Sequence, residues 1–204
     1  MNRIAIVDYG AGNLDSVARA VQECGADPVL TTGPKDLESA SRIILPGVGV
    51  FAEAMRRLNE RGYVDALHEQ VVGKKIPILG ICLGMQLLAS RGVEGGDTNG
   101  LGLIEGEVRR LEPPSSEIRL PHVGWNEVVH EGSPLFQGIP SGRDFYFVHS
   151  YHLKPVRGQD VASRTPYCGM FVSAVSNELV FGTQFHPEKS QKAGFQLLRN
   201  FLSI

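Results

Sequence analysis

Short apolar runs recur through the first ninety residues, and stretches with apolar positions at helical spacing separate them. Such a run predicts a buried strand, whereas apolar residues three and four positions apart predict a helix that packs against the sheet. In chain order, the expected elements are strand 3–7, helix 14–24, strand 28–31, short helix 34–40, strand 42–45, helix 51–61, helix 63–72 and a strand that begins at 76. This alternation of strands and helices implies a parallel sheet covered by helices on both faces.

The pattern changes after residue 90, where short runs typical of strands alternate with turns. A glycine-rich stretch at 92–100 predicts a loop, and Asn177-Glu178 predicts a hairpin turn. The strands expected here are 103–111, 127–129, 145–151, 161–164, 170–175 and 179–185, followed by a closing helix at 191–202. Because the chain contains no linker or repeat, we expect residues 1–204 to form a single α/β domain with a mixed, mostly parallel sheet flanked by helices.

Composition and charge narrow the class of protein. The formal net charge of −2 predicts no basic surface of the kind that binds nucleic acid. No run approaches the ~18 apolar residues that a membrane-spanning helix needs, and the apolar stretch at the N-terminus is too short for a signal peptide. Cys24, Cys82 and Cys168 show neither metal-ligand spacing nor a disulfide pattern. We therefore expect a cytoplasmic protein with no metal, no cofactor, no nucleic-acid partner and no membrane association.

Cys82 lies between Gly80 and Gly84, directly after a buried strand and before a helix expected at 85–90. A strand, a tight turn and a helix with a nucleophile at the tip form a nucleophile elbow, here with cysteine in place of serine. Glycine is needed on either side because such a turn is strained and crowded. Free N–H groups at the start of the helix favour the thiolate, which is the reactive form. The alternative is a buried structural cysteine beside a glycine-rich turn.

A cysteine nucleophile needs a base, and His186 is the strongest candidate among the six histidines. It follows the strand expected at 179–185, and the rigid Pro187 places Glu188 two positions on. A carboxylate there can orient the imidazole and stabilise its charged form. An ordinary strand-ending turn is the alternative. The other histidines are expected to have surface or core roles: His68, His122, His130, His149 and His152.

Attack by a thiolate on a carbonyl creates an oxyanion, which two aimed N–H donors stabilise. The amide of Leu83, the residue after the nucleophile, is the natural first donor. The glycine-rich sequence at 46–49 ends a neighbouring strand and can supply the second donor, although in isolation it predicts only a turn. Because sites form at the carboxyl ends of parallel strands, we expect 47–49 and 80–84 to lie at the same edge of the sheet.

Together, these stretches resemble a known family. Cys82 in Gly-Ile-Cys-Leu-Gly-Met-Gln, with His186 and Glu188, is similar to the triad of class I (Cys-His-Glu) glutamine amidotransferases, which have a flavodoxin-like α/β fold. Along nearly the whole chain the sequence resembles the glutaminase subunits of imidazole glycerol phosphate synthase, an enzyme of histidine biosynthesis. The stretches that carry this resemblance are 8–13 (DYGAGN), 45–49 (LPGVG), 102–106 (GLIEG), 121–126 (PHVGWN) and 145–151 (FYFVHSY).

The resemblance implies a reaction and a set of roles. Cys82 attacks the side-chain amide of glutamine to give a glutamyl thioester and ammonia, His186 transfers the protons, and Glu188 orients His186. In this family a glycine-rich backbone reorients to complete the oxyanion hole. The residues implied for that hole are Leu83 with Val48 or Gly49, and those implied for glutamine binding are Gln86, Glu94, Ser150 and Tyr151.

The resemblance also implies a partner. The family delivers ammonia to a cyclase subunit with a (βα)8 barrel, where imidazole glycerol phosphate is made and an aminoimidazole carboxamide ribotide is released. A chain of 204 residues does not include that barrel, so a heterodimer with a separate cyclase chain is expected. The implied docking residues, around the mouth of the site, are Asn13, Trp125, Asn126, Tyr146 and Lys189.

Other functions remain open at the level of sequence. The nearest alternatives are the glutaminase subunits of pyridoxal phosphate synthase and anthranilate synthase, which share the triad but are not expected to carry Gly124-Trp125-Asn126. A triad-bearing peptidase or a non-catalytic stress protein on a similar sheet is less consistent with Gln86 and Glu188. A pure binding module would leave the elbow around Cys82 unexplained.

Overall fold

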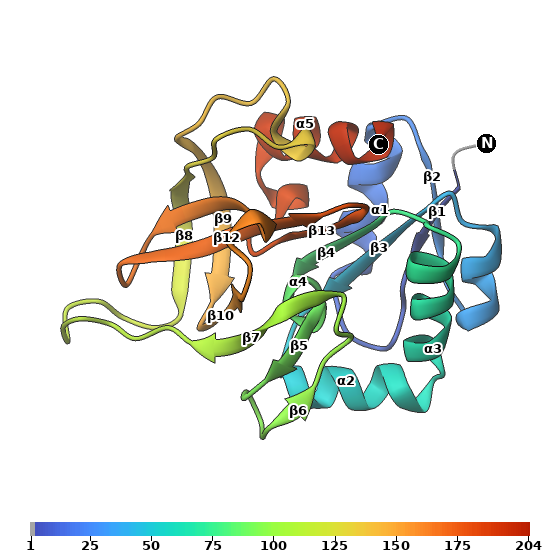
Figure 1. Ribbon diagram of the computed structural model, residues 1–204. Coiled ribbons are helices and arrows are strands. Elements are labelled where there is room, and N and C mark those ends of the chain that lie inside the picture. The colour runs from blue at the N-terminus through green and yellow to red at the C-terminus, as the bar shows by residue number, and fades with distance from the viewer. Residues whose placement is uncertain (1–2) are drawn as a thin grey trace.

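A seven-stranded sheet forms the centre of the computed structural model, which describes residues 3–204 (Figure 1). Its strands are β1 (Arg3–Ile6), β2 (Asp27–Leu30), β3 (Arg42–Gly47), β4 (Ile78–Cys82), β11 (Val161–Pro166), β12 (Met170–Asn177) and β13 (Val180–Thr183). They are ordered β11-β12-β13-β4-β3-β1-β2. The strands from β13 to β2 are parallel, while β12 and β11 extend the sheet by antiparallel pairing. The predicted mixed, mostly parallel sheet is confirmed.

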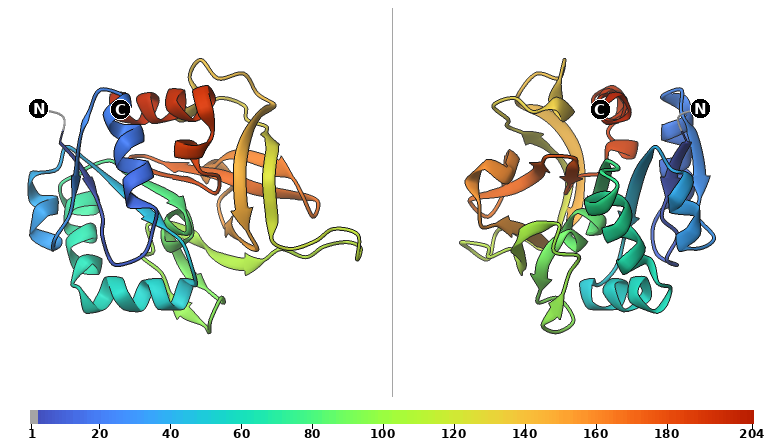
Figure 2. Two further views of the ribbon diagram at one scale, coloured as in Figure 1. Left: turned by 180° about the vertical axis from the view of Figure 1, so that it is seen from behind. Right: turned by 45° about the vertical axis from the view of Figure 1, so that its right-hand side comes forward.

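Helices cover both faces of this sheet (Figures 1 and 2). Along β3, Ile43 and Leu45 point into one apolar core, and Ile44 points into the other. Because neighbouring residues of a strand face opposite sides, a strand that is covered twice must be apolar throughout, which explains its continuous apolar run. The helices are α1 (Leu14–Glu23) and α5 (Gln191–Ser203) on one face, and α2 (Phe51–Glu60), α3 (Tyr63–His68) and α4 (Leu83–Leu87) on the other. Short helical turns are η1 (Pro34–Ser39), η2 (Glu69–Gly73), η3 (Pro134–Phe136), η4 (Gly158–Asp160) and η5 (Pro187–Lys189).

Two smaller sheets lie beside the antiparallel end of the central sheet (Figure 1). One has the order β10-β7-β5-β6, with β5 (Ala89–Gly92), β6 (Thr98–Asn99), β7 (Ile104–Arg110) and β10 (Tyr151–Pro155). The other is an antiparallel pair of β8 (His122–Val128) and β9 (Arg143–His149). In this pair His122 lies opposite His149, and Trp125 lies opposite Tyr146.

Several elements differ from the sequence prediction. The helix expected to reach residue 90 ends at Leu87, and β5 begins at Ala89. Backbone pairing with β6 and β7 determines the conformation of β5, so tertiary hydrogen bonding overrides local helix propensity. The strand predicted at 145–151 is divided at Ser150 into β9 and β10, and the strand predicted at 127–129 begins earlier, at His122. The sequence predicts a single mixed sheet, whereas the structure places some of its strands in two further sheets.

The carboxyl ends of β3 and β4 meet at one edge of the central sheet. Gly47, the last residue of β3, lies opposite Cys82, the last residue of β4. The expectation that the glycine-rich segments after these two strands share an edge is confirmed. Since β1 and β13 run in the same direction, the segments that follow them also begin at this edge.

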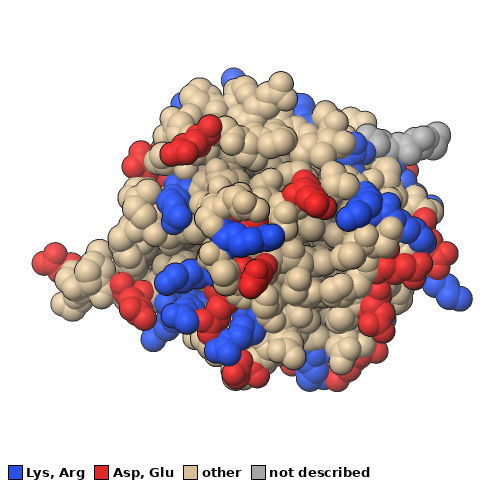
Figure 3. All heavy atoms as spheres, in the orientation of Figure 1, with Lys and Arg blue, Asp and Glu red and all other residues tan. Residues whose placement is uncertain are grey.

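Charged side chains of both signs are interspersed over the face shown in Figure 3. This face therefore has no extended field of a single sign that would attract a nucleic acid. Within residues 3–204, no helix combines the length and apolar character required to cross a bilayer.

Candidate active site

Cys82 occupies a strained turn between β4 and α4. Its backbone has φ of 55° and ψ of −110°, a conformation that residues with a side chain rarely adopt. A Cβ on Gly84 would lie 1.7 Å from the Leu45 carbonyl oxygen, and a Cβ on Gly80 would lie 2.6 Å from the Gly84 carbonyl oxygen. Both positions therefore require glycine, and the turn presents the Cys82 side chain at the edge of the sheet.

We expect Gly84→Ala to lower the free energy of unfolding by about 3 kcal/mol or more, because the added methyl group collides with the backbone of β3. Urea unfolding followed by circular dichroism measures this loss. Gly73→Ala is the matched control, since a Cβ there meets nothing within 4 Å. Equal losses in the two variants would contradict the steric explanation.

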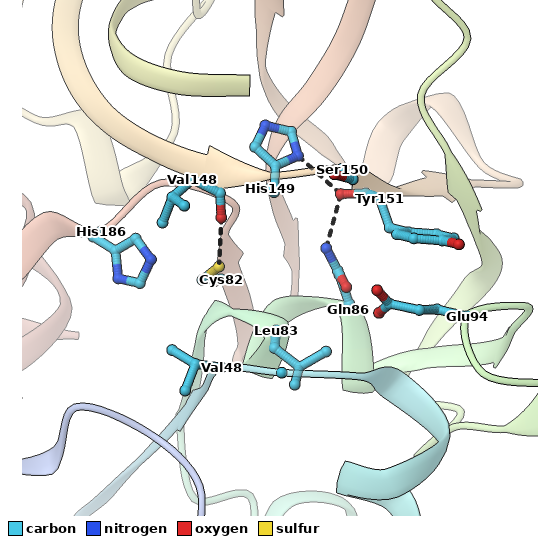
Figure 4. Close-up of a pocket in the computed structure, with 11 residues that line it drawn as sticks. Val48, Cys82, Leu83, Gln86, Glu94, Val148, His149, Ser150, Tyr151 and His186 are labelled. Atoms are coloured by element: carbon cyan, nitrogen blue, oxygen red, sulfur yellow. Dashed lines mark hydrogen bonds between the residues drawn. The ribbon is translucent and has the colours of Figure 1, made fainter. Parts of the chain in front are cut away.

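His186 and Glu188 follow β13, the strand next to β4. His186 Nδ1 donates to Glu188 Oε1 at 2.8 Å, and the two side chains are only 3% and 1% exposed. The His186 ring lies beside Cys82 (Figure 4), and its second nitrogen, Nε2, is buried and has no other partner within residues 3–204. A thiol, an imidazole and a carboxylate thus follow one another in the order that a nucleophile, a base and its orienting group require.

The surroundings of His186 favour its charged form. Burial alone lowers the pKa of this side chain, but Cys82 and Glu188 both favour the imidazolium and together raise the pKa to about 10. An imidazolium stabilises a thiolate beside it, and the Glu188 carboxylate stabilises the imidazolium from its other side. The three groups are therefore arranged for a thiolate–imidazolium pair.

Two neighbours orient the Cys82 thiol. Sγ lies 3.8 Å from the Val148 carbonyl oxygen (Figure 4), and Gln184 Nε2 lies 3.7 Å from Sγ. Gln184 is fully buried, and its Oε1 accepts from Gln86 Nε2 at 2.9 Å. The sequence did not predict Val148 or Gln184 as site residues. Val148 lies within the 145–151 stretch and Gln184 lies directly after β13, but only the tertiary structure brings their atoms to the thiol.

One pocket contains most of the residues predicted from the sequence (Figure 4). Glu188 is not part of its lining and lies behind His186. Val148 and His149 are lining residues that the sequence did not predict. The full lining comprises Val48, Gly49, Cys82, Leu83, Gln86, Glu94, Val148, His149, Ser150, Tyr151 and His186. Across residues 3–204, no group of three or more His, Cys, Asp or Glu side chains is placed to hold a metal ion.

Gln86 and Glu94 lie on the side of the pocket away from His186 (Figure 4). Gln86 is buried and donates through Nε2 to the Tyr151 carbonyl oxygen at 2.8 Å. Glu94 Oε2 accepts from the Phe51 N–H at 3.2 Å, at the start of α2. Burial raises the pKa of Glu94, and the Phe51 N–H opposes that effect. A cationic ligand would favour the carboxylate form of Glu94 further.

Comparison with known proteins identifies the family. A family model described as glutamine amidotransferase class-I matches residues 5–204. The chain belongs to this family. The resemblance inferred from the sequence is therefore confirmed.

Individual relatives define the branch of the class-I amidotransferases. Imidazole glycerol phosphate synthase subunit HisH 1 of Campylobacter jejuni strain RM1221 is 50% identical over 202 residues, covering 98% of this chain and 100% of the relative. Subunit HisH of Moorella thermoacetica is 46% identical, covering 98% and 94%. A solved glutamine amidotransferase structure aligns over 98% of this chain and 97% of its own, with a TM-score of 0.76 at 20% identity, which shows the fold alone. This amidotransferase thus belongs with the HisH subunits.

The backbone segments predicted to form the oxyanion hole border the pocket of this amidotransferase. Val48 follows β3 and is 46% exposed. Gly49 has φ of 109°, a conformation that favours glycine. Leu83 begins α4, so its N–H belongs to the first helical turn, whose donors have no partner within the helix. The two segments lie on neighbouring strand ends, while their role in binding an oxyanion stays a prediction.

The predicted docking residues are placed in different ways. Trp125 and Tyr146 lie opposite one another on β8 and β9, with ring centroids 6.0 Å apart. Lys189 Nζ is 5.9 Å from the centre of the Tyr146 ring. The Asn126 side chain, in contrast, is engaged within the protein, because Nδ2 bonds His122 Nε2 at 3.2 Å. Asn13 lies on the loop between β1 and α1, where it precedes the helix.

Proposed function

We propose that this amidotransferase hydrolyses glutamine to glutamate and ammonia at Cys82, and that it supplies the ammonia to a cyclase subunit. The arrangement of Cys82, His186 and Glu188, with the 2.8 Å bond from His186 to Glu188, is the observation that supports the catalytic assignment. The HisH relatives, at 46–50% identity, support the role as glutaminase subunit of imidazole glycerol phosphate synthase.

The proposed reaction has two halves. In the first, the Cys82 thiolate attacks the side-chain carbonyl carbon of glutamine, and the new oxyanion accepts N–H bonds from Leu83 and the Val48–Gly49 backbone. His186 donates its proton to the amide nitrogen, the C–N bond breaks, and ammonia leaves behind a glutamyl thioester. In the second half, neutral His186 takes a proton from water, hydroxide adds to the thioester carbon, and the C–S bond breaks to release glutamate. Glu188 holds the imidazole in the same orientation throughout.

We assign recognition of the glutamine backbone to the side of the pocket formed by Glu94 and the Ser150–Tyr151 segment. The Glu94 carboxylate lines the pocket opposite the catalytic base and suits the α-ammonium group of the substrate. Gln86 acts from inside the wall, since its Nε2 is already bonded to Tyr151 and Gln184. Its proposed contribution is therefore to hold the segment against which glutamine binds.

The exposed apolar face of β8 and β9 is the proposed docking surface for the cyclase. Val123, Trp125 and Val148 are 57%, 48% and 38% exposed there, and large apolar and aromatic side chains are typical of interface centres. This surface adjoins the catalytic site, because the backbone N–H of His186 donates to the Tyr146 carbonyl oxygen at 2.9 Å. Ammonia released at Cys82 would pass to a (βα)8-barrel cyclase that makes imidazole glycerol phosphate and an aminoimidazole carboxamide ribotide.

We expect Trp125→Ala to weaken binding of the cyclase subunit about 30-fold, since burying an exposed indole at an interface is typically worth about 2 kcal/mol. Isothermal titration calorimetry with the purified subunit measures the dissociation constant. Val156→Ala is the control, because Val156 is 69% exposed but follows the end of β10 that is away from the pocket. An unchanged dissociation constant for Trp125→Ala would place the interface elsewhere.

Glutamate release from glutamine, measured with and without the cyclase subunit and its nucleotide ligand, tests the proposed function. Strong stimulation by both is expected, because a partner docked on β8 and β9 contacts β9, whose last residues line the pocket. High activity that is indifferent to this partner would keep the glutaminase chemistry but assign the chain to another amidotransferase system. No glutamate release under any of these conditions would contradict the proposal.

We also propose a cytoplasmic location. Cys24, Cys82 and Cys168 are free thiols. A nucleophilic thiolate must remain reduced in order to act, and the cytoplasm keeps it so.

A further inference from the structure

A chain of buried hydrogen bonds connects β8 with the wall of the pocket. Asn126 Nδ2 is 3.2 Å from His122 Nε2, and His122 Nδ1 is 3.0 Å from His149 Nε2. His149 Nδ1 is 2.8 Å from the Tyr151 carbonyl oxygen, which also accepts from Gln86 Nε2. The two histidines are 4% and 6% exposed. We call the series Asn126–His122–His149–Tyr151 the histidine relay.

The Tyr151 end of the relay determines the direction of every bond in it. A carbonyl oxygen can only accept, so His149 Nδ1 must carry a proton. In a neutral imidazole the other nitrogen then accepts, which requires His122 Nδ1 to donate to His149 Nε2. By the same reasoning His122 Nε2 accepts, and Asn126 Nδ2 must donate to it.

The Asn126 end gives the same direction independently. Asn126 Oδ1 accepts from the Glu127 N–H at 2.9 Å, and Nδ2 donates to the Pro166 carbonyl oxygen at 3.1 Å. These two backbone partners fix the amide orientation, so that Nδ2 faces His122 Nε2. Both ends therefore demand the same tautomer, with the proton on Nδ1, in both rings.

The surroundings favour the neutral form of both rings, and aromatic side chains pack against His122. Burial lowers the pKa of His149 to about 3 and that of His122 to about 4. The hydrogen bond to the Tyr151 carbonyl oxygen raises the pKa of His149, but burial outweighs it. The neighbouring His122, His152 and His186 also lower this pKa. The His122 ring stacks on Tyr167 with centroids 4.0 Å apart and on Phe147 at 4.9 Å. Protonation of either ring would place a hydrogen on both of its nitrogens and so remove the acceptor nitrogen that the relay needs.

His149 lines the pocket, yet both of its ring nitrogens are occupied within the protein. It can therefore neither transfer a proton nor bond a ligand through nitrogen without breaking the relay. Its donor, with that of Gln86, occupies both lone pairs of the Tyr151 carbonyl oxygen. The junction of β9 and β10, at Ser150 and the first residue of β10, Tyr151, is thereby held from two sides.

We propose that His122 and His149 are positioning residues for glutamine, which fix the Tyr151 carbonyl and, through it, the Gln86 side of the pocket. This inference deepens the proposed function and rests on it as far as glutamine is concerned. The relay starts on β8 next to Trp125, so the strand of the docking surface also determines the position of the pocket wall. Loss of the His149 donor frees this junction, which weakens substrate binding more than it slows the chemical steps at Cys82.

The tautomers can be measured in the full chain without any turnover. Labelling the histidine rings with ¹⁵N and recording their NMR shifts distinguishes a protonated from an unprotonated ring nitrogen. We expect His122 and His149 to remain neutral with the proton on Nδ1 between pH 5.5 and pH 8. A proton on Nε2 of either ring, or a charged ring in this range, would overturn the relay.

Kinetics of the complex with the cyclase subunit test the positioning role. His149→Leu removes the donor to Tyr151 and is expected to raise KM for glutamine about fivefold to tenfold, with kcat changed less than threefold. His149→Asn should restore KM to within about threefold of the wild-type value, since the Asn amide nitrogen occupies the position of Nδ1. If both variants raise KM equally, or if kcat falls while KM is unchanged, the positioning role is wrong.

His130→Leu is the control for loss of a partly buried histidine outside the relay. His130 Nε2 bonds the Ile139 carbonyl oxygen at 3.0 Å, outside the relay and the pocket, and its ring stacks on Phe136. We expect this variant to leave KM unchanged, and an equal rise in KM would show a general effect of destabilisation instead. The two proposals can fail independently. A wild-type complex that releases no glutamate would contradict the proposed function, whereas the wrong ring tautomers would contradict the relay.

Discussion

Cys82→Ala is expected to lower glutamine-dependent synthesis by the complex by a factor on the order of 10⁴–10⁶, the loss typical of removing a catalytic nucleophile. Without Sγ no thioester forms, and water has no comparable route to the glutamine amide in this pocket. The flanking glycines that permit the turn are unchanged, so the elbow and the docking strands are expected to persist. Synthesis from added ammonium salts should therefore remain at the wild-type rate, since ammonia from solution does not require this pocket.

Parallel assays of product formation from glutamine and from ammonium salts separate the catalytic from the structural role of Cys82. Cys24→Ala is the control, because Cys24 is a free thiol beside Phe195, remote from the pocket lining. It should support both activities. Equal loss of the two activities in Cys82→Ala would mean that Cys82 maintains the fold or the interface, and the proposed chemistry would be wrong.

The elbow could be predicted from sequence because its constraints are local. Gly80 and Gly84 are required by contacts within the turn itself and with the adjacent strand, so the spacing around Cys82 carries the structural information. The relation of His186 to Glu188 is local as well, since only Pro187 separates the two residues along the chain. The parallel order of the strands then brings both segments to one edge.

The remaining parts of the site depend on contacts between distant segments. His149 bonds His122, which is 27 positions away, and Gln86 bonds Gln184, which is 98 positions away. No spacing along the chain marks such pairs, so His122 and His149 could only be interpreted as core or surface histidines. Asn126 was predicted as a docking residue, but strand alternation turns its side chain to the opposite face from Trp125. The conformation of β5 was missed for the same reason, because its partners are supplied by the tertiary structure.

Glu188→Gln is expected to lower kcat for glutamine hydrolysis on the order of 10³–10⁴-fold, while the shape of the side chain is retained. The amide can still accept from His186 Nδ1, but it cannot balance the charge of the imidazolium that forms during the reaction. Steady-state kinetics of the complex measure the loss. Because synthesis from ammonium salts does not use the triad, that activity is the internal control and should be unchanged.

Glu188→Gln is also expected to change how the free energy of unfolding depends on pH, and the raised pKa of His186 determines the direction. In the folded wild type the pKa of His186 is raised from 6.5 to about 10, so the charged ring binds its proton more tightly than the unfolded chain does. This contribution to stability is complete below pH 6.5 and is lost as the pH rises toward 10. Removing the Glu188 charge reduces it, so the difference in unfolding free energy between wild type and Glu188→Gln should be largest near pH 6 and should shrink toward pH 10. Urea unfolding at the two pH values measures this difference, and a difference that does not vary with pH would mean that Glu188 stabilises the site without acting on the charge of His186.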